Sequence, residues 1–230
     1  MSPKRQVALL VAVFAALGIG VSVGITAAGG GLGGQINIMN PPTSKDIFHV
    51  GQNIHNGTTL AYSLDSIGPK SELKSANVDL EFVNNSNDWA VHVLVKNGTE
   101  DEKQAVVQMS NVLTLIGQPD PSFKLYFEPI RLSIFSIRDM DYQGADKYLY
   151  VGAPWNTIET ASSSVVTRIT GQEQVQTPSG SYNAFILSYK LGTKTSMLWL
   201  DATVPLPIEA DVYDAYDNLQ YRFVLTHFTP

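Results

Sequence analysis

The chain contains no cysteine among its 230 residues. This absence excludes disulfide bonds, thiolate metal sites, cysteine nucleophiles and lipidation of an amino-terminal cysteine. The G-x-S-x-G, H-E-x-x-H and G-x-x-x-x-G-K patterns are also missing, and these are signatures of serine hydrolases, zinc proteases and phosphate-binding loops. The sequence therefore predicts a non-enzymatic protein without a cofactor, stabilised by its hydrophobic core.

Charge is missing from the start of the chain, where no charged residue occurs between Arg5 and Lys45. The uncharged stretch of residues 7–28 matches the roughly 20 residues that a helix needs to cross a bilayer. Cations on its amino-terminal side indicate a cytoplasmic amino terminus and an extracytoplasmic remainder. We interpret residues 1–28 as a transmembrane anchor. A cleaved signal peptide is the alternative, although signal cores are usually shorter.

Small residues recur along this segment with a spacing of four: Ala12, Ala16, Gly20 and Gly24. Such spacing allows two helix backbones to approach closely in lipid, so these residues are candidates for a helix–helix contact. A straight helix drifts away from a period of four, which places only some of them on one face. The segment is therefore either a contact surface or a simple tether in the bilayer.

Acidic residues outnumber basic ones. The chain has 15 Lys and Arg against 21 Asp and Glu. Without Lys4 and Arg5, which precede the anchor, the remainder has 13 against 21, a net charge of −8. Nucleic-acid binding needs clustered cations, so the sequence predicts no nucleic-acid partner.

Beyond the anchor, residues 29–44 read as a Gly- and Pro-rich linker, and residues 45–230 read as one extracytoplasmic domain of antiparallel β structure. Apolar and polar residues alternate between turn signals, which predicts strands. The fold class is therefore mainly β, a curved antiparallel sheet as a half-barrel or sandwich. The expected strands are residues 78–83, 89–96, 104–109, 132–137, 164–170, 182–190, 196–200, 208–212 and 220–228. Residues 100–115 leave helix and strand equally open, and few other helix signals occur.

The carboxy-terminal third carries turn and strand marks. They are the stretch Gly171-Gln172-Glu173-Gln174-Val175-Gln176-Thr177-Pro178-Ser179-Gly180-Ser181-Tyr182, then Trp199-Leu200-Asp201, then Pro205-Leu206-Pro207-Ile208-Glu209-Ala210. This pattern resembles exported proteins similar to the LolA/LolB-like lipoprotein carriers. The resemblance implies a curved sheet that wraps around helices and leaves a cavity for an apolar ligand or lipid.

Two groups of residues are weak candidates for metal binding. His49 and His55 lie six residues apart and suggest an extracellular copper site, although the spacing fits no compact ligand pair. Asp211, Asp214 and Asp217 recur every third residue, and carboxylates of this kind bind calcium. The glycine and final glutamate of a calcium loop are absent, so a solvated strand edge is the stronger interpretation.

Three N-x-S/T sequons begin at Asn56, Asn84 and Asn97. In an exported chain each is a candidate glycosylation site, and each falls in turn-like sequence.

Together these features favour a membrane-anchored extracytoplasmic interaction module, an accessory subunit of a membrane or cell-envelope complex. Residues 7–28 would contact the bilayer, and the domain would bind a protein partner. A carrier of an apolar ligand is the alternative. An exported metal-binding protein, a pilin-like subunit and a hydrolase are weaker hypotheses.

Overall fold

The computed structural model describes residues 47–67, 75–98, 101–137, 147–159 and 164–230. The anchor at 1–28 and the linker at 29–44 lie outside these ranges, so both stay predictions. The same holds for the helix–helix contact predicted at Ala12, Ala16, Gly20 and Gly24. Within the described part, no helix has the length and apolarity needed to cross a bilayer.

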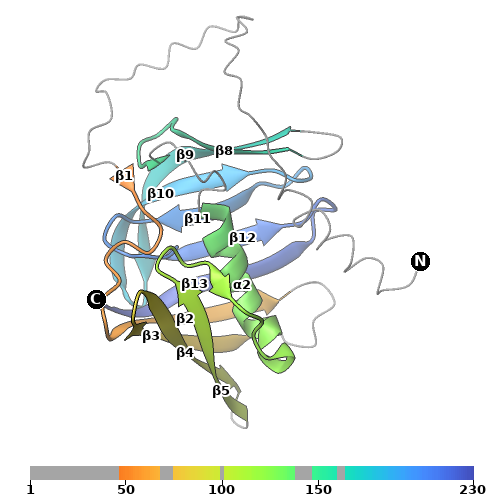
Figure 1. The fold of residues 1–230 in the computed structure, drawn as a ribbon. Helices are drawn as coiled ribbons and strands as arrows, with labels where there is room; N and C mark the ends of the chain where they lie inside the picture. The colour runs from red at the N-terminus through yellow and green to blue at the C-terminus, as the bar shows by residue number, and fades with distance from the viewer. Residues whose placement is uncertain (1–46, 68–74, 99–100, 138–146, 160–163) are drawn as a thin grey trace, which may run out of the picture.

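One antiparallel sheet of eleven strands dominates the structure and curls around a single described helix (Figure 1). Its strand order is β6-β5-β4-β3-β2-β13-β12-β11-β10-β9-β8, and β1 and β7 form a separate pair. The strands are β1 (Ile47–Phe48), β2 (Thr58–Ile67), β3 (Ala76–Asn85), β4 (Asp88–Asn97), β5 (Asp101–Ser110), β6 (Leu115–Ile116), β7 (Lys147–Tyr148), β8 (Pro154–Glu159), β9 (Ser164–Thr177), β10 (Gly180–Tyr189), β11 (Ser196–Leu200), β12 (Glu209–Tyr213) and β13 (Leu219–Thr229).

Most of the predicted strands are confirmed. The expectations for residues 78–83, 89–96, 164–170, 182–190, 196–200, 208–212 and 220–228 correspond to β3, β4, β9, β10, β11, β12 and β13. Residues 101–110, which the sequence left open between helix and strand, form β5. Its alternation explains this outcome, because Val107 and Met109 are buried while Val106 is exposed.

The prediction of a strand at residues 132–137 was wrong. These residues end the helix α2 (Pro121–Ile137), which lies across the concave face of the sheet (Figure 1). Residues 132–137 form a short, mostly apolar run that suits a strand, and Pro129 lacks the N–H that a helix interior uses. A helical period is nevertheless present, since Phe123, Phe127, Ile130 and Ile134 are all buried.

The core lies between α2 and the inner face of the sheet. On the central strands β2 and β13, alternate side chains point inward, and Tyr62 packs edge-on against Phe223 with ring centroids 5.0 Å apart. Because β2 and β13 pair with each other, the first long strand joins the last, and two meanders become one sheet. The buried residues of these two strands are Leu60, Tyr62, Leu64, Tyr221, Phe223 and Leu225.

One end of the curved sheet is covered by two loops that bond to each other. Gly51 N–H donates to the carbonyl of Pro205 at 3.3 Å, and Gln52 Nε2 donates to the carbonyl of Ala202 at 2.8 Å. Tyr62 Oη donates to the carbonyl of Pro207 from inside the core at 3.0 Å. Pro205 and Pro207 thus lie in a buried connection before β12, as expected for residues that cannot donate to a sheet.

Candidate functional site

The concave face of the sheet is filled in the part of the chain that the structure describes. α2 is held there by polar contacts, since Ser133 Oγ donates to Tyr221 Oη at 3.0 Å and Trp155 Nε1 donates to the carbonyl of Ile137 at 3.0 Å. Burial raises the pKa of Tyr221 well above its usual value. No buried side-chain nitrogen or oxygen of the described residues lacks a hydrogen-bond partner. A helix thus lies on the concave face, as the resemblance implies, and its apolar side chains belong to the core.

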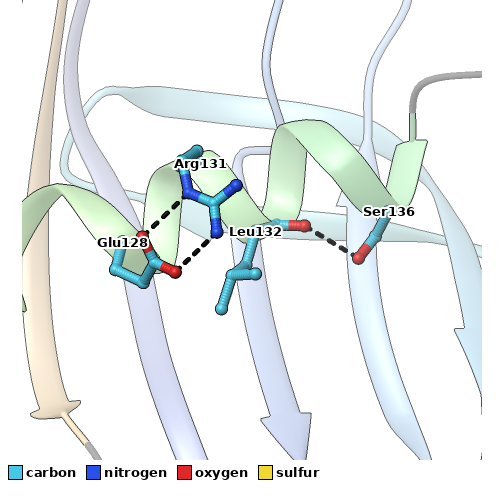
Figure 2. Close-up of polar contacts among 4 residues, drawn as sticks. All are labelled: Glu128, Arg131, Leu132 and Ser136. Atoms are coloured by element: carbon cyan, nitrogen blue, oxygen red, sulfur yellow. Dashed lines mark hydrogen bonds and ion pairs between the residues drawn. The ribbon is translucent and has the colours of Figure 1, made fainter. Parts of the chain in front are cut away.

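The half-buried side of α2 carries an ion pair. Arg131 donates from Nε and Nη2 to both carboxylate oxygens of Glu128, at 2.8 and 2.6 Å (Figure 2). One turn later, Ser136 Oγ donates to the carbonyl of Leu132 at 2.9 Å. The hydrogen bond to Glu128 raises the pKa of the Arg131 guanidinium. These contacts lie within the helix, so they stabilise α2 rather than form a site for a ligand.

The residues of the carboxy-terminal pattern meet on the outer face of the sheet. Trp199 Nε1 donates to Glu173 Oε1 at 2.6 Å, which joins β11 to the β9–β10 hairpin. Glu209 is the cross-strand neighbour of Trp199, and burial, followed by the nearby charge of Asp211, raises its pKa. Three residues of the pattern, Glu173, Trp199 and Glu209, therefore meet around one tryptophan.

The three aspartates considered for calcium serve different partners. Asp211 accepts a bidentate interaction from Arg222 on the neighbouring strand. Asp214 accepts from the backbone N–H groups of Tyr216 and Asn218, at 2.8 and 2.9 Å. All of these bonds are of the kind that shape a turn or a strand pair.

Asp217 lies in the same turn as Asp214, and its backbone N–H donates to the carbonyl of Asp214 at 3.1 Å. The carboxylate of Asp217 accepts the hydroxyl of Thr193 and the backbone N–H groups of Thr193 and Lys194, the latter two at 2.7 and 2.8 Å. The hydrogen bond from the Thr193 hydroxyl, followed by the backbone bonds, lowers the pKa of Asp217. Gly192 makes the approach possible, because a Cβ at this position would lie 2.5 Å from Asp217 Oδ1. Asp217 therefore ties the β10–β11 turn to the β12–β13 turn.

The two histidines considered for copper lie in the loop that precedes β2. Both are exposed, and their recorded hydrogen bonds are made by backbone N–H groups: His49 to Gln52 Oε1 at 3.0 Å, and His55 to Thr58 Oγ1 at 2.8 Å. Across the described ranges, no three His, Asp or Glu side chains gather in a way that could hold a metal ion.

The three sequons lie at strand ends and turns. Asn56 and Asn84 are exposed and adjacent, because the backbone N–H of Asn84 donates to Asn56 Oδ1 at 2.9 Å. Asn97 ends β4 and lies at the opposite end of the β3–β4 hairpin. Attachment of glycans to these side chains stays a prediction.

A shallow hollow of about 980 Å³ crosses the outer face of β13, β2, β3, β4 and β5. Small side chains on β2, among them Thr59 and Ala61, make the floor. Loose polar contacts lie along its walls: His92 Nδ1 lies 3.7 Å from the carboxylate of Glu81, and the carboxylate of Asp79 lies 3.7 Å from Lys96 Nζ. Both contacts are half exposed, so they contribute little to stability and can rearrange around a ligand.

Exposed apolar side chains gather beside this hollow. Val106 on β5 is 55% exposed, Val112 in the following turn is 55% exposed and Ile116 on β6 is 47% exposed. Ile116 pairs with Gln108, two residues from Val106 along β5. Sequence reasoning missed this surface. The available signal was the pattern Glu102, Gln104, Val106, in which a large apolar residue occupies the solvent-facing row of a strand.

Comparison with known proteins gives no family. No protein-family model and no curated protein matches the chain. Similar solved structures include a predicted lipoprotein from Parabacteroides distasonis, at 12% identity over 80% of this chain and 99% of that chain, with a TM-score of 0.37. A predicted exported protein with a YmcC-like fold from Bacteroides fragilis has 9% identity over 80% of this chain and 100% of that chain, with a TM-score of 0.35.

A third similar structure is the MucA/MucB complex of Pseudomonas aeruginosa. The match has 15% identity over 76% of this chain, a TM-score of 0.40, and covers 52% of the matched chain. All three likenesses are remote. They assign the chain to no specific family.

Proposed function

We propose that this chain is a membrane-tethered, extracytoplasmic interaction module without catalytic activity, an accessory subunit that binds a protein partner through the outer face of β2–β5. The observation that carries the proposal is the hollow lined in part by Val106, with Val112 and Ile116 exposed in the β5–β6 hairpin that follows. Exposed apolar side chains at a hollow are typical of interaction sites, whereas scattered ones are normal on any surface.

The remaining features of the chain agree with this role. α2 packs against the concave face, which leaves the outer face of β2–β5 for a partner. The uncharged segment at 7–28 would hold the domain close to the bilayer, where a membrane-embedded partner is within reach.

Native purification from membranes in mild detergent tests the proposal. We expect the chain to migrate with a protein partner, and we expect Val106→Asp to lose that partner. Val166→Asp is a matched control, because Val166 is 45% exposed on β9, away from the hollow. A lone monomer that retains lipid would contradict the proposal and support a carrier.

The intact mass of the purified protein reports cleavage after the anchor and glycans at Asn56, Asn84 and Asn97 in one measurement.

The anchor can be tested separately as a contact surface. Replacement of Gly20 and Gly24 by Leu would widen a close helix–helix approach. If this change weakens the complex while Val106→Asp does not, the partner is held in the bilayer and not by the β domain. If association survives the change, residues 7–28 act only as a tether.

A further inference from the structure

The outer edge of β5 leaves backbone groups open along most of its length. On one side, β5 pairs with β4 from Asp101 to Ser110. On the other side, β6 pairs only with Gln108 and Met109. In the described part of the chain, no strand lies beyond residues 101–107, and β5 with its short neighbour forms one border of the sheet (Figure 1). Such an edge is a template for an additional strand.

The direction of these open groups follows from the turn after β5. Ser110 N–H donates to the carbonyl of Thr114 at 2.8 Å, and so points away from β4. In an antiparallel strand, the N–H and C=O of a residue point to the same side, and the side alternates from one residue to the next. The same side is reached at every second residue before Ser110. The backbone N–H and C=O groups of Val106, Gln104 and Glu102 therefore point toward the open edge.

The side chains of the same residues face outward, at the edge of the hollow. Cross-strand pairs continue from them across the sheet in two rows. One row is Gln104, Leu94, Asp79 and Ala61, and the other is Val106, His92, Glu81 and Thr59. A strand added to β5 would extend both rows by one residue each, so its side chains would lie next to the hollow.

We propose that the β5 edge binds an extended segment of a partner protein by strand addition, and that this segment presents both apolar and basic residues on its outer face. The inference rests on the proposed function, whose binding surface it specifies. Backbone groups of Glu102, Gln104 and Val106 supply the hydrogen bonds, and Val106 contacts an apolar side chain. A basic residue of the partner would lie opposite Glu102. Lys96 Nζ lies 3.7 Å from both Glu102 and Asp79, so this one cation is divided between two carboxylates.

Charge argues for a basic partner over a second copy of this chain. Two copies would bring together two domains with a net charge of −8 each, from 13 basic and 21 acidic residues after Lys4 and Arg5. Like charges of this size oppose close pairing. The hollow adds negative charge at the same surface, because Asp79 and Glu81 line its walls. A segment with basic residues is complementary to this surface.

The other border of the sheet is protected in a way that β5 is not. β8 begins at Pro154, which has no N–H to offer to an added strand. Lys147 Nζ also donates to the carbonyl of Trp155 on the same strand. Proline and lysine at an edge are the devices by which sheets avoid unwanted pairing. β8 begins with the proline and is contacted by Lys147 of β7, whereas the open part of β5 contains no proline, so the two borders are not equivalent.

Binding of synthetic peptides to the full chain in detergent micelles tests the inference. The probe, called the Val–Lys peptide, is a fluorescent ten-residue peptide that carries Val and Lys in turn at every second position and Thr between them, so that one face presents both. It is compared with a Val–Glu peptide, in which Glu replaces Lys, and with a Val–Lys peptide that has Pro in place of Thr. We expect only the first to raise fluorescence anisotropy. We also expect it to slow hydrogen exchange at the amides of Gln104 and Val106, because these N–H groups would become bonded.

Two variants at one position separate the backbone from the side chain. Gln104→Pro removes an outward N–H without breaking the β4 ladder, and we expect affinity for the Val–Lys peptide to fall by about tenfold or more, the effect of one lost hydrogen bond or two. Gln104→Ala retains the N–H and should bind within about twofold of the native chain. Thermal unfolding of both variants confirms that the sheet is intact.

Each outcome decides a separate point. Equal binding of the Val–Lys peptide by Gln104→Pro and Gln104→Ala would overturn strand addition, and equal binding of the Val–Glu peptide would overturn the basic partner. A concentration-dependent dimer that Gln104→Pro abolishes would identify a second copy as the occupant. If the native complex survives Gln104→Pro, the inference fails while the proposed function stands. If the native chain has no partner at all, the proposed function fails whatever the peptides show.

Discussion

Glu209 is the residue whose charge is least well accommodated in the described structure. Burial raises its pKa, and the neighbouring carboxylates of Asp211 and Glu173 raise it further, while Arg222 lowers it. The folded state therefore holds the proton of Glu209 more tightly than the unfolded chain does. Stability from this group is fully present below the unfolded pKa and is lost as the pH rises through the folded pKa.

Replacement of Glu209 by Gln should remove this loss. We expect Glu209→Gln to unfold at a higher urea concentration than the native chain at pH 7, and the difference to vanish near pH 3.5, below the unfolded pKa of about 4.3. Urea denaturation at both pH values measures it. Asp211→Asn is the control with the opposite sign, because it breaks the bidentate pair with Arg222. A Glu209→Gln variant less stable than the native chain at pH 7 would contradict this account.

At the scale of elements, the contact between α2 and β13 is the most testable. Ser133 and Tyr221 are both buried, and their hydroxyl groups bond at 3.0 Å. We expect Ser133→Ala to reduce the free energy of unfolding by about 1–3 kcal/mol, because the hydroxyl of Tyr221 is left without this partner. The double variant Ser133→Ala/Tyr221→Phe should lose less than the two single variants combined. Strict additivity in denaturant unfolding would show that the bond does not hold the helix.

This element also shows where the sequence was informative. Strands that alternate cleanly between turn signals, such as β3 and β4, were predicted within a few residues, because period-two burial is a local property. The helix was missed because its last six residues form a short, mostly apolar run that also suits a strand, and because Pro129 weakens the helix signal. Burial against a sheet that forms elsewhere in the chain decides the outcome, and no local pattern contains that information.

The candidate site was hidden for a related reason. Val106 is ordinary in a strand, and it becomes informative only when β5 is seen to border the sheet with its outer edge open. The strand β2, which was not predicted at all, supplies the floor of the hollow. The recognisable sequence motifs lie in the carboxy-terminal third, where Trp199 bonds to Glu173. They contain no information about the hollow on β2–β5.

For the whole molecule, β13 determines whether there is one cooperative unit or two. It pairs with β12 on one side and with β2 on the other, so it is the only described strand that joins the β2–β6 meander to the β8–β12 meander. Its inner face also supplies Tyr221 and Phe223 to the core beneath α2. Neither meander can bury its inner face completely until the last strand has been added.

We therefore expect removal of residues 219–230 to unfold the whole domain and not only its carboxy-terminal half. Limited proteolysis and near-ultraviolet circular dichroism of the truncated chain measure this, with removal of residues 229–230 alone as the control that leaves most of the β13 ladder in place. Pairing between the first long strand and the last also predicts slow folding, since distant contacts must form before the core closes. A protease-resistant fragment containing β2–β6 would show instead that the partner-binding half folds independently, and that β13 serves only to attach the other half to it.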